Sequence, residues 1–318
     1  MSSGKKVLTV FGATGNQGGA IINTILGDSK ASSEFQLRGI TRDVTRPKSK
    51  ALSDKGVEMV AGDTEDPSSL RDAIKGAYGV FAMTNYWDKM DHELELQQGK
   101  AIADMCKEEG VQHLIWSSLF NVKELSKGAL PHVYHWDSKA QVEQYIRDIG
   151  IPATFLMPGF FMSNIPGSNL RRGEDGKFVL AMAMPDNAQV PLWAPELDTG
   201  KVAKAIWLKR DQVLGKRILA ATDYVTPKQM LESFQKVFPE AGKGAHFVEL
   251  TEDQFKGALK SRGTSEFIAQ ELYENMRVIP EFGYYGGDSL DFSHSILDDK
   301  LTTWEEFVKA APAFKDLK

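Results

Sequence analysis

The chain has 318 residues, of which 42% are hydrophobic and 25% are charged, and its net charge at pH 7 is −5. These values are typical of a globular protein whose length suits one large domain or two. The negative charge argues against binding of nucleic acid through a basic surface. No apolar run approaches the roughly 20 residues that a membrane span needs.

The single cysteine and the start of the chain bear on where the protein is found in the cell. Cys106 excludes an internal disulfide, which favours a reducing intracellular compartment. It lies in a helical pattern, where we expect a buried thiol rather than a reactive one. Because the first predicted strand begins at residue 7, it leaves no room for a signal peptide. We therefore expect a cytoplasmic protein, with the nucleus as an alternative location.

The first predicted elements are a strand over residues 7–11, a glycine-rich loop and a helix with an apolar face over residues 21–26. The loop contains four glycines, Gly12, Gly15, Gly18 and Gly19. A strand that runs through such a loop into a helix is the setting of a dinucleotide-phosphate site. Glycines allow a tight turn and close approach to a diphosphate, and the helix N-terminus offers free N–H groups. The G-x-x-G-x-x-G spacing is typical of the short-chain dehydrogenase/reductase superfamily, and a generic glycine turn is the alternative.

Strand and helix patterns then alternate along the first half of the chain. Further strands are predicted over residues 35–40, 57–60, 78–83, 111–117 and 153–157. Helices are predicted after a cap at Asp66, over residues 93–109 and over residues 138–149. This alternation predicts an α/β fold with a Rossmann-type, doubly wound parallel sheet. Ligands of such sheets bind outside the carboxyl ends of the strands.

The pattern loosens after residue 157 and becomes typical of mixed α and β structure. We therefore predict an NAD(P)-binding Rossmann domain over residues 1–157 and a smaller α+β C-terminal lobe over residues 158–318. Two runs of the second half, residues 190–192 and 217–220, look like strands and could return to the main sheet.

The end of the second strand indicates which dinucleotide binds. An NAD site usually carries an acidic residue there, which holds the ribose 2′-hydroxyl, but this chain has Arg42, 24 residues past Gly18. A guanidinium can pair with a 2′-phosphate, and Arg46 adds positive charge, whereas Asp43 would oppose the phosphate if it faced inward. We predict NADP(H), and a solvated basic loop is the alternative. Asp63 could reach the adenine edge or could only stabilise a turn.

The expected proton-transfer pair is incomplete. Short-chain reductases use Tyr-x-x-x-Lys, in which the lysine binds the nicotinamide ribose and lowers the tyrosine pKa. Here Lys139 is present, but His135 stands four residues before it, and Tyr134 would lie about 140° around the helix from Lys139. His135 shares the face of Lys139 and could transfer a proton. These two residues are the candidate catalytic pair. The alternatives are a solvated lysine and a histidine that only makes a structural hydrogen bond.

The ends of the fourth, fifth and sixth strands supply the remaining candidates. Those expected to face a substrate or partner in the cleft are Tyr86, Trp87, Ser117, Phe161 and Asn164. Phe160 is expected beside the nicotinamide end of the cofactor. The aromatic wall that these residues suggest could hold an aromatic substrate, or it could be ordinary core between the two lobes.

The chain resembles the NmrA-like family, an atypical branch of the short-chain dehydrogenase/reductase superfamily, and within it the NADP-binding, redox-sensor-like members. The matching stretches are FGATGNQGG, TRDVTR, TNYW, QQGKAIAD, HWDSK, RDIGIPATFLMPGFFMSN and LTTWEEF. The resemblance implies dinucleotide contacts through Gly12, Gly15, Gln17, Gly18, Arg42, Arg46, Asp63, Thr84 and Lys139, with Thr14, Asn16, Asn85 and Phe160 completing the candidate set. Members that lack the tyrosine are often regarded as regulators that respond to the dinucleotide pool.

Two functions stay open. A complete phosphate cradle beside an incomplete proton-transfer pair favours an NADP(H) sensor that acts through protein partners. The alternative is an NADPH-dependent reductase of a small carbonyl, enone, quinone or imine that uses Lys139 or His135. We expect no metal, because no metal-ligand spacing is present in the sequence. We also expect no hydrolase activity, because the sequence has no hydrolase motif. Direct DNA binding is disfavoured, and a homodimer is compatible with the sequence.

Overall fold

A seven-stranded parallel sheet forms the centre of this computed structural model, which describes residues 4–317. Across the sheet the strands follow the order β11-β6-β5-β4-β1-β2-β3. Their bounds are β1 (Lys6–Val10), β2 (Phe35–Thr41), β3 (Glu58–Ala61), β4 (Gly79–Ala82), β5 (His113–Ser117), β6 (Ala153–Pro158) and β11 (Arg217–Ala220). The chain order reverses between β1 and β4, so the predicted Rossmann-type, doubly wound sheet is confirmed.

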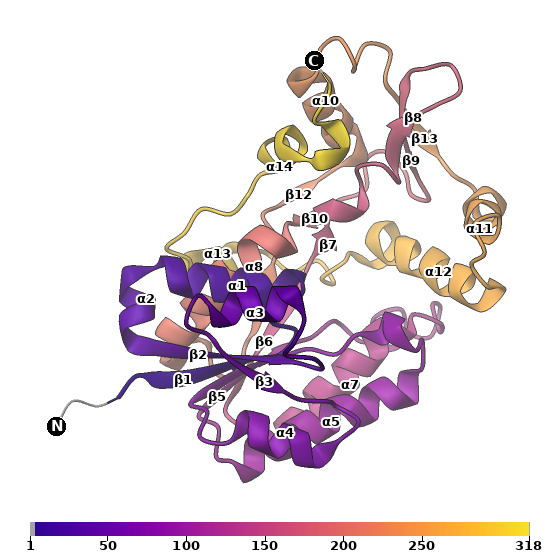
Figure 1. Cartoon of the computed structure of the whole chain (residues 1–318). Helices are drawn as coiled ribbons and strands as arrows, with labels where there is room; N and C mark the ends of the chain where they lie inside the picture. The colour runs from indigo at the N-terminus through magenta and orange to yellow at the C-terminus, as the bar shows by residue number, and fades with distance from the viewer. Residues whose placement is uncertain (1–3, 318) are drawn as a thin grey trace.

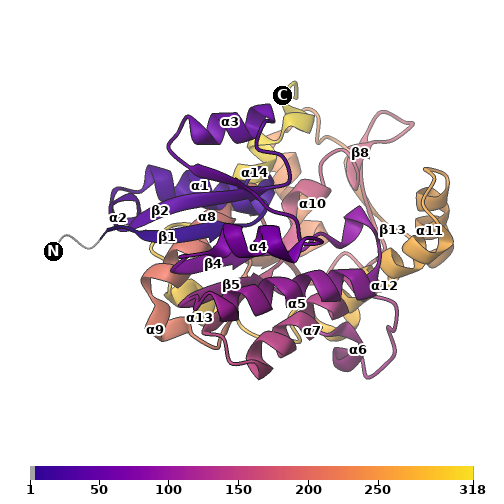
Figure 2. The ribbon, with the colours of Figure 1, turned by 60° about the horizontal axis from the view of Figure 1, so that its bottom comes forward.

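Helices cover both faces of this sheet (Figures 1 and 2). One face carries α1 (Asn16–Gly27), α2 (Ser29–Glu34), α3 (Pro47–Ser53) and α8 (Pro195–Leu208), and the other carries α4 (Pro67–Ile74), α5 (His92–Glu108) and α7 (Tyr134–Asp148). The short helices α6 (Val122–Leu125) and α9 (Arg210–Val213) lie in the connections. Packing of α8 on α1 is close: a Cβ on Gly200 would lie 2.3 Å from the carbonyl oxygen of Ala20.

The second half of the chain forms two small sheets outside the main one. Their strand orders are β12-β10-β7 and β13-β9-β8. The strands are β7 (Phe160–Phe161), β8 (Leu170–Arg172), β9 (Phe178–Met182), β10 (Val190–Trp193), β12 (Asp223–Val225) and β13 (His246–Glu249). The accompanying helices are α10 (Pro227–Val237), α11 (Glu252–Lys260), α12 (Glu266–Phe282) and α14 (Trp304–Ala310), whereas α13 (Asp291–Ser295) packs beside β11 of the main sheet, where the Ser293 hydroxyl accepts from the Leu219 N–H at 2.8 Å. Of the two strand-like runs, 217–220 returns to the main sheet beside β6, whereas 190–193 pairs with β7 and β12.

Helix α7 begins one turn earlier than the sequence pattern predicts. Its N-cap, Val133, has no side chain that can accept a hydrogen bond. Instead, the Glu271 carboxylate on α12 accepts from the backbone N–H of His135 at 3.0 Å. An acceptor that is 136 residues away in the sequence therefore satisfies one of the free backbone N–H groups in the first turn of the helix. This contact places His135 inside the helix, on the turn that precedes Lys139.

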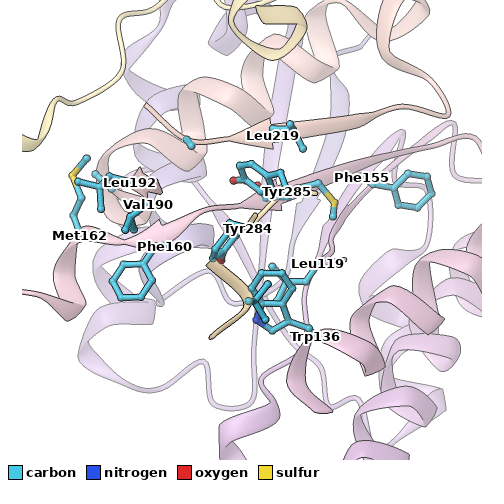
Figure 3. Packing of buried hydrophobic residues seen from close by; sticks show 14 of the residues in the cluster. Leu119, Trp136, Phe155, Phe160, Met162, Val190, Leu192, Leu219, Tyr284 and Tyr285 are labelled. Carbon is cyan, nitrogen blue, oxygen red and sulfur yellow. The ribbon is translucent and has the colours of Figure 1, made fainter. Parts of the chain in front are cut away.

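The hydrophobic core continues from the sheet into the C-terminal lobe around the end of β6. Figure 3 shows Trp136, Leu119 and Tyr284 packed together, with Phe160 on the far side of Tyr284. The hydroxyls of Tyr284 and Tyr285 donate to the carbonyl oxygens of Pro158 and Met157 at 3.2 and 2.9 Å. These aromatic residues of the loop after α12 therefore belong to the core.

Two further observations concern the chain as a whole. Cys106 is fully buried on α5, and burial raises the pKa of its thiol. Both observations fit a side chain that packs in the core and does not react. Within residues 4–317, none of the helices has both the length and the apolar character that a bilayer crossing requires.

Candidate functional site

The glycine-rich loop has the shape that a diphosphate needs. Gly12 has a φ of 63°, and a Cβ on Gly18 would lie 2.3 Å from the carbonyl oxygen of Gly12. The loop therefore closes tightly under the start of α1. In the part of the chain that the structure describes, the backbone N–H groups of residues 16–18 have no hydrogen-bond partner. Three free donors at the positive end of a 12-residue helix fit a phosphate group.

Two arginines lie on the loop after β2, the strand next to β1. The side chains of Arg42 and Arg46 are 74% and 75% exposed. Arg42 lies 3.4 Å from Asp88, and Arg46 lies 3.5 Å from Asp43. The Asp43 carboxylate accepts hydrogen bonds from the backbone and side chain of Thr45, and these bonds lower its pKa. Both guanidiniums are accessible to a phosphate from solvent.

Asp63, after β3, also lies at this edge of the sheet. Its side chain accepts from the backbone N–H of Glu65 at 3.0 Å, which is a turn hydrogen bond. Contact of Asp63 with an adenine ring stays a prediction.

A cavity of about 440 Å³ opens at the carboxyl ends of β4, β5 and β6, between the sheet and the C-terminal lobe. The predicted residues that the structure brings together in its wall are Gln17, Thr84, Asn85, Tyr86, Trp87, Ser117, His135, Lys139, Phe160, Phe161 and Asn164. The other candidate cofactor residues lie outside this wall, on the loops after β1, β2 and β3 and on the first turn of α1: Gly12, Thr14, Gly15, Asn16, Gly18, Arg42, Arg46 and Asp63. The cavity therefore adjoins the glycine loop through Gln17, whose side-chain oxygen accepts from the Ser117 hydroxyl at 3.2 Å.

A buried carboxylate holds Lys139. Glu95, on α5, is 2% exposed and accepts from the Thr84 hydroxyl at 2.7 Å. The Ser138 hydroxyl and the Lys139 ammonium also donate to it. Burial lowers the pKa of Lys139, and the charge of Glu95 acts in the opposite direction. The lysine is thus fixed in the cavity wall by Glu95, which also accepts from Thr84 and Ser138.

A second buried carboxylate holds His135. Glu271, on α12, is fully buried, and its Oε1 lies 2.6 Å from His135 Nδ1 and accepts from the His135 backbone N–H. Its other oxygen accepts from the Tyr86 hydroxyl at 2.8 Å. A carboxylate at Nδ1 sets the imidazole orientation and assigns the proton to that nitrogen, which leaves Nε2 for a second partner. Burial lowers the pKa of His135, with Glu271 opposing the shift.

The tyrosines near the site have other roles. Burial and the neighbouring Glu271 raise the pKa of Tyr86, so its hydroxyl stays a donor to that carboxylate. Tyr134 stacks on Phe267 with ring centroids 5.4 Å apart and is not part of the cavity wall. Trp87 packs at the mouth with its ring centroid 4.8 Å from that of His135. Among the described residues, no tyrosine occupies the position that the short-chain reductase pair would give it.

Sequence reasoning missed both buried carboxylates, although a signal was present for each. Glu95 lies on the face of α5 that carries Gly99, Ile102 and Cys106, which are all buried. Glu271 lies three residues after Ile268 and seven before Val278, on the buried face of α12. A carboxylate on an apolar helical face is costly to bury unless it is paired, so each position predicts a polar partner. Within residues 4–317, no cluster of His, Cys, Asp and Glu side chains is arranged to hold a metal ion.

Comparisons with known proteins agree with this geometry. The profile of the NmrA-like family matches residues 4–308. The NmrA-like family domain-containing oxidoreductase malD of Malbranchea aurantiaca is 30% identical over an alignment that covers 99% of this chain and 94% of that protein. A second such oxidoreductase, ptmS of Penicillium ochrochloron, is 28% identical over 78% of this chain and 76% of its own length.

Solved structures share the fold at lower identity. The negative transcriptional regulator NmrA in complex with NADP superposes with a TM-score of 0.80 at 19% identity, over 98% of this chain and 97% of NmrA. The NADPH-dependent quinone oxidoreductase of Escherichia coli complexed with NADPH gives 0.76 at 23% identity, over 95% of this chain and 98% of that protein. The profile match over nearly the whole length, together with the identity to malD, shows that this chain belongs to the NmrA-like family.

Proposed function

We propose that this protein is an NADPH-dependent reductase of a small apolar molecule bound in the cavity between the lobes. One observation carries the proposal: His135 lies in the cavity wall with its Nδ1 held by the buried Glu271, one helical turn before Lys139. A histidine held in this way can take the proton-transfer role of the absent tyrosine. The names of the curated relatives and of the quinone oxidoreductase support reduction as the reaction class.

The residues of the sheet edge fit NADPH, which when bound would supply a hydride. The free N–H groups of residues 16–18 would hold the diphosphate, and Arg42 and Arg46 would hold the 2′-phosphate. Lys139, fixed by Glu95, would donate to the nicotinamide ribose. The NADP and NADPH complexes of the structural neighbours support this assignment.

The remaining chemistry belongs to His135. With Nδ1 directed at Glu271, Nε2 is the nitrogen that can give a proton to the substrate atom that becomes anionic during reduction. Glu271, which is fully buried, stabilises the charged imidazolium. Tyr86 donates its hydroxyl to the other oxygen of Glu271 and does not itself transfer a proton to the substrate.

The chain provides a matched control for the test. His132 makes the same pair of hydrogen bonds with Glu274 that His135 makes with Glu271, but it is not part of the cavity wall. NADPH oxidation should be followed optically against quinones, enones, aldehydes and imines in the wild type, His135→Gln and His132→Gln. We expect turnover to fall by about 100-fold or more in His135→Gln and to stay near wild type in His132→Gln. Saturable NADPH binding without turnover of any class would refute the reductase proposal.

A cofactor sensor is the second candidate, and the Arg42–Asp88 ion pair favours it. Asp88 ends the 3₁₀ turn η1 (Tyr86–Asp88), which also carries Trp87, 42% exposed. A 2′-phosphate that took Arg42 from Asp88 would free one end of this turn and change an exposed aromatic surface. The regulator NmrA shares the fold. A partner or oligomer that forms with NADP(H) and not with NAD(H), and that is lost in Arg42→Ala, would support this function.

A further inference from the structure

We propose that the substrate of this cavity is a largely apolar carbonyl, enone, quinone or imine compound that also carries a carboxylate, and that this carboxylate, which is not itself reduced, binds Arg171 and Arg262 at the end remote from the glycine loop. The inference rests on the proposed function only in naming the substrate class, because ligand binding at this end does not require turnover. The charged side chains of the cavity wall all have the same sign. The wall contains Lys139, Arg171 and Arg262, whereas no Asp or Glu occurs among the described residues that line it.

The strand β8 places Arg171 toward the cavity. In its antiparallel pairing with β9, Leu170 lies opposite Leu180 and Arg172 lies opposite Phe178. These four side chains share one face, on which the Arg172 guanidinium lies over the Phe178 ring. Arg171, between them, lies opposite Val179 on the other face. Ala181, two residues along β9 from Val179, also lines the cavity. The alternation of the strand therefore separates two adjacent arginines onto opposite sides.

The turn after helix α11 places Arg262 beside an apolar surface. Phe255, Ala258 and Leu259 share one face of α11 and line the cavity, and Arg262, whose backbone N–H donates to the Leu259 carbonyl oxygen at 3.0 Å in the turn that follows, lines it too. Leu272 and Met276 of α12 line it too. None of the residues of α11 is fully buried, so this apolar face is open to the cavity. Figure 1 shows α11, α12 and β8 on the same side of the C-terminal lobe.

The two arginines differ from the other cations of these elements in having no partner. Lys256 and Lys260 pair with Glu252 and Glu266, and Arg277 pairs with Glu281. In the part of the chain that the structure describes, the side chains of Arg171 and Arg262 make no hydrogen bond, ion pair or ring contact. Guanidiniums recognise carboxylates through two parallel hydrogen bonds, and Phe255 and Leu259 suit an apolar body. Together they describe an anionic, largely apolar ligand.

Binding of two probes of nearly equal shape tests the site. Titration calorimetry should compare 2-naphthoate with the neutral 2-naphthamide, with and without NADP⁺, in the wild type, in the double variant Arg171→Gln/Arg262→Gln and in Arg172→Gln. We expect the wild type to bind 2-naphthoate about tenfold more tightly than 2-naphthamide. The double variant should lose this preference and keep its affinity for 2-naphthamide, which shows that the cavity is intact.

The variant Arg172→Gln removes the same charge from the same strand outside the cavity, and it should behave as the wild type. The proposal is overturned if 2-naphthoate does not bind, if both probes bind with equal affinity, or if Arg172→Gln loses the preference as fully as the double variant. Failure of the reductase proposal is distinguishable from these results, since it would appear as absent turnover with the preference for the carboxylate retained.

Discussion

The substitution Glu271→Gln tests whether the carboxylate behind His135 serves proton transfer. At present Oε1 accepts two N–H groups of His135, and Oε2 accepts the Tyr86 hydroxyl. A glutamine can keep its oxygen toward His135, and the Tyr86 hydroxyl can turn to accept from the new amide. The change therefore leaves the shape intact and removes the negative charge from three hydrogen bonds.

The expected cost follows from those three bonds. A hydrogen bond to a charged group contributes about 1 kcal/mol more than a neutral one, so the free energy of unfolding should fall by about 3 kcal/mol. Turnover should fall by about 100-fold or more, because the imidazolium of His135 loses its counter-charge. The KM for NADPH should change little, since Glu271 is not among the residues that would hold the cofactor.

Steady-state kinetics and thermal unfolding should be measured together for Glu271→Gln and Glu274→Gln. Glu274 accepts from His132 through both of its oxygens, away from the cavity, so a glutamine leaves one of these two N–H groups without an acceptor. The Glu274 variant should therefore lose at least as much stability and keep its turnover. Because Glu271 acts through His135, the double variant His135→Gln/Glu271→Gln should be no slower than His135→Gln alone. Equal losses of turnover in the Glu271 and Glu274 variants, or multiplicative losses in the double variant, would refute this reasoning.

Three further predictions concern the cofactor and the pH dependence. Arg42→Ala should weaken NADP(H) about tenfold and leave NAD(H) nearly unchanged in titration calorimetry, and equal losses would contradict a 2′-phosphate contact. Gly18→Ala places a methyl group 2.3 Å from the Gly12 carbonyl oxygen, so fluorescence titration should show NADPH affinity reduced about tenfold or more. Burial lowers the pKa of His135 from its ordinary value, and reduction needs its protonated form. Hence kcat/KM should fall as pH rises through a midpoint lower than that of an ordinary imidazole, and His135→Gln should lack this limb.

The parts of the fold that were predictable depend on local patterns. Asp66 followed by Pro67 predicted the start of α4, and the structure shows the Asp66 carboxylate accepting from Ser68 and Ser69. The apolar runs predicted six of the seven strands of the sheet within one or two residues. The run at 217–220 was recognisable as a strand, but its neighbour was not, because parallel pairing with β6 depends on the course of about 60 intervening residues.

The candidate site divides in the same way. Gly12, Gly18 and Arg42 could be found from sequence, since a loop and the end of an adjacent strand define their surroundings. Glu271 could not be assigned to His135, because the two residues are separated by 136 positions and meet only when α12 packs on the start of α7. The presence of Arg171 and Arg262 in one cavity wall depends likewise on how β8 and the turn after α11 pack in the C-terminal lobe, which neither segment determines alone.

Transfer of deuterium tests the proposed reaction most directly. NADPH deuterated at the transferable position of the nicotinamide should be incubated with the protein and with quinones, enones, aldehydes and imines, including members of each class that carry a carboxylate able to bind Arg171 and Arg262. The products should be analysed by mass spectrometry. The reductase proposal predicts one deuterium at the reduced carbon for each NADPH consumed, and loss of this product in His135→Gln but not in His132→Gln. Saturable binding of the deuterated cofactor with no deuterium in any product would contradict it.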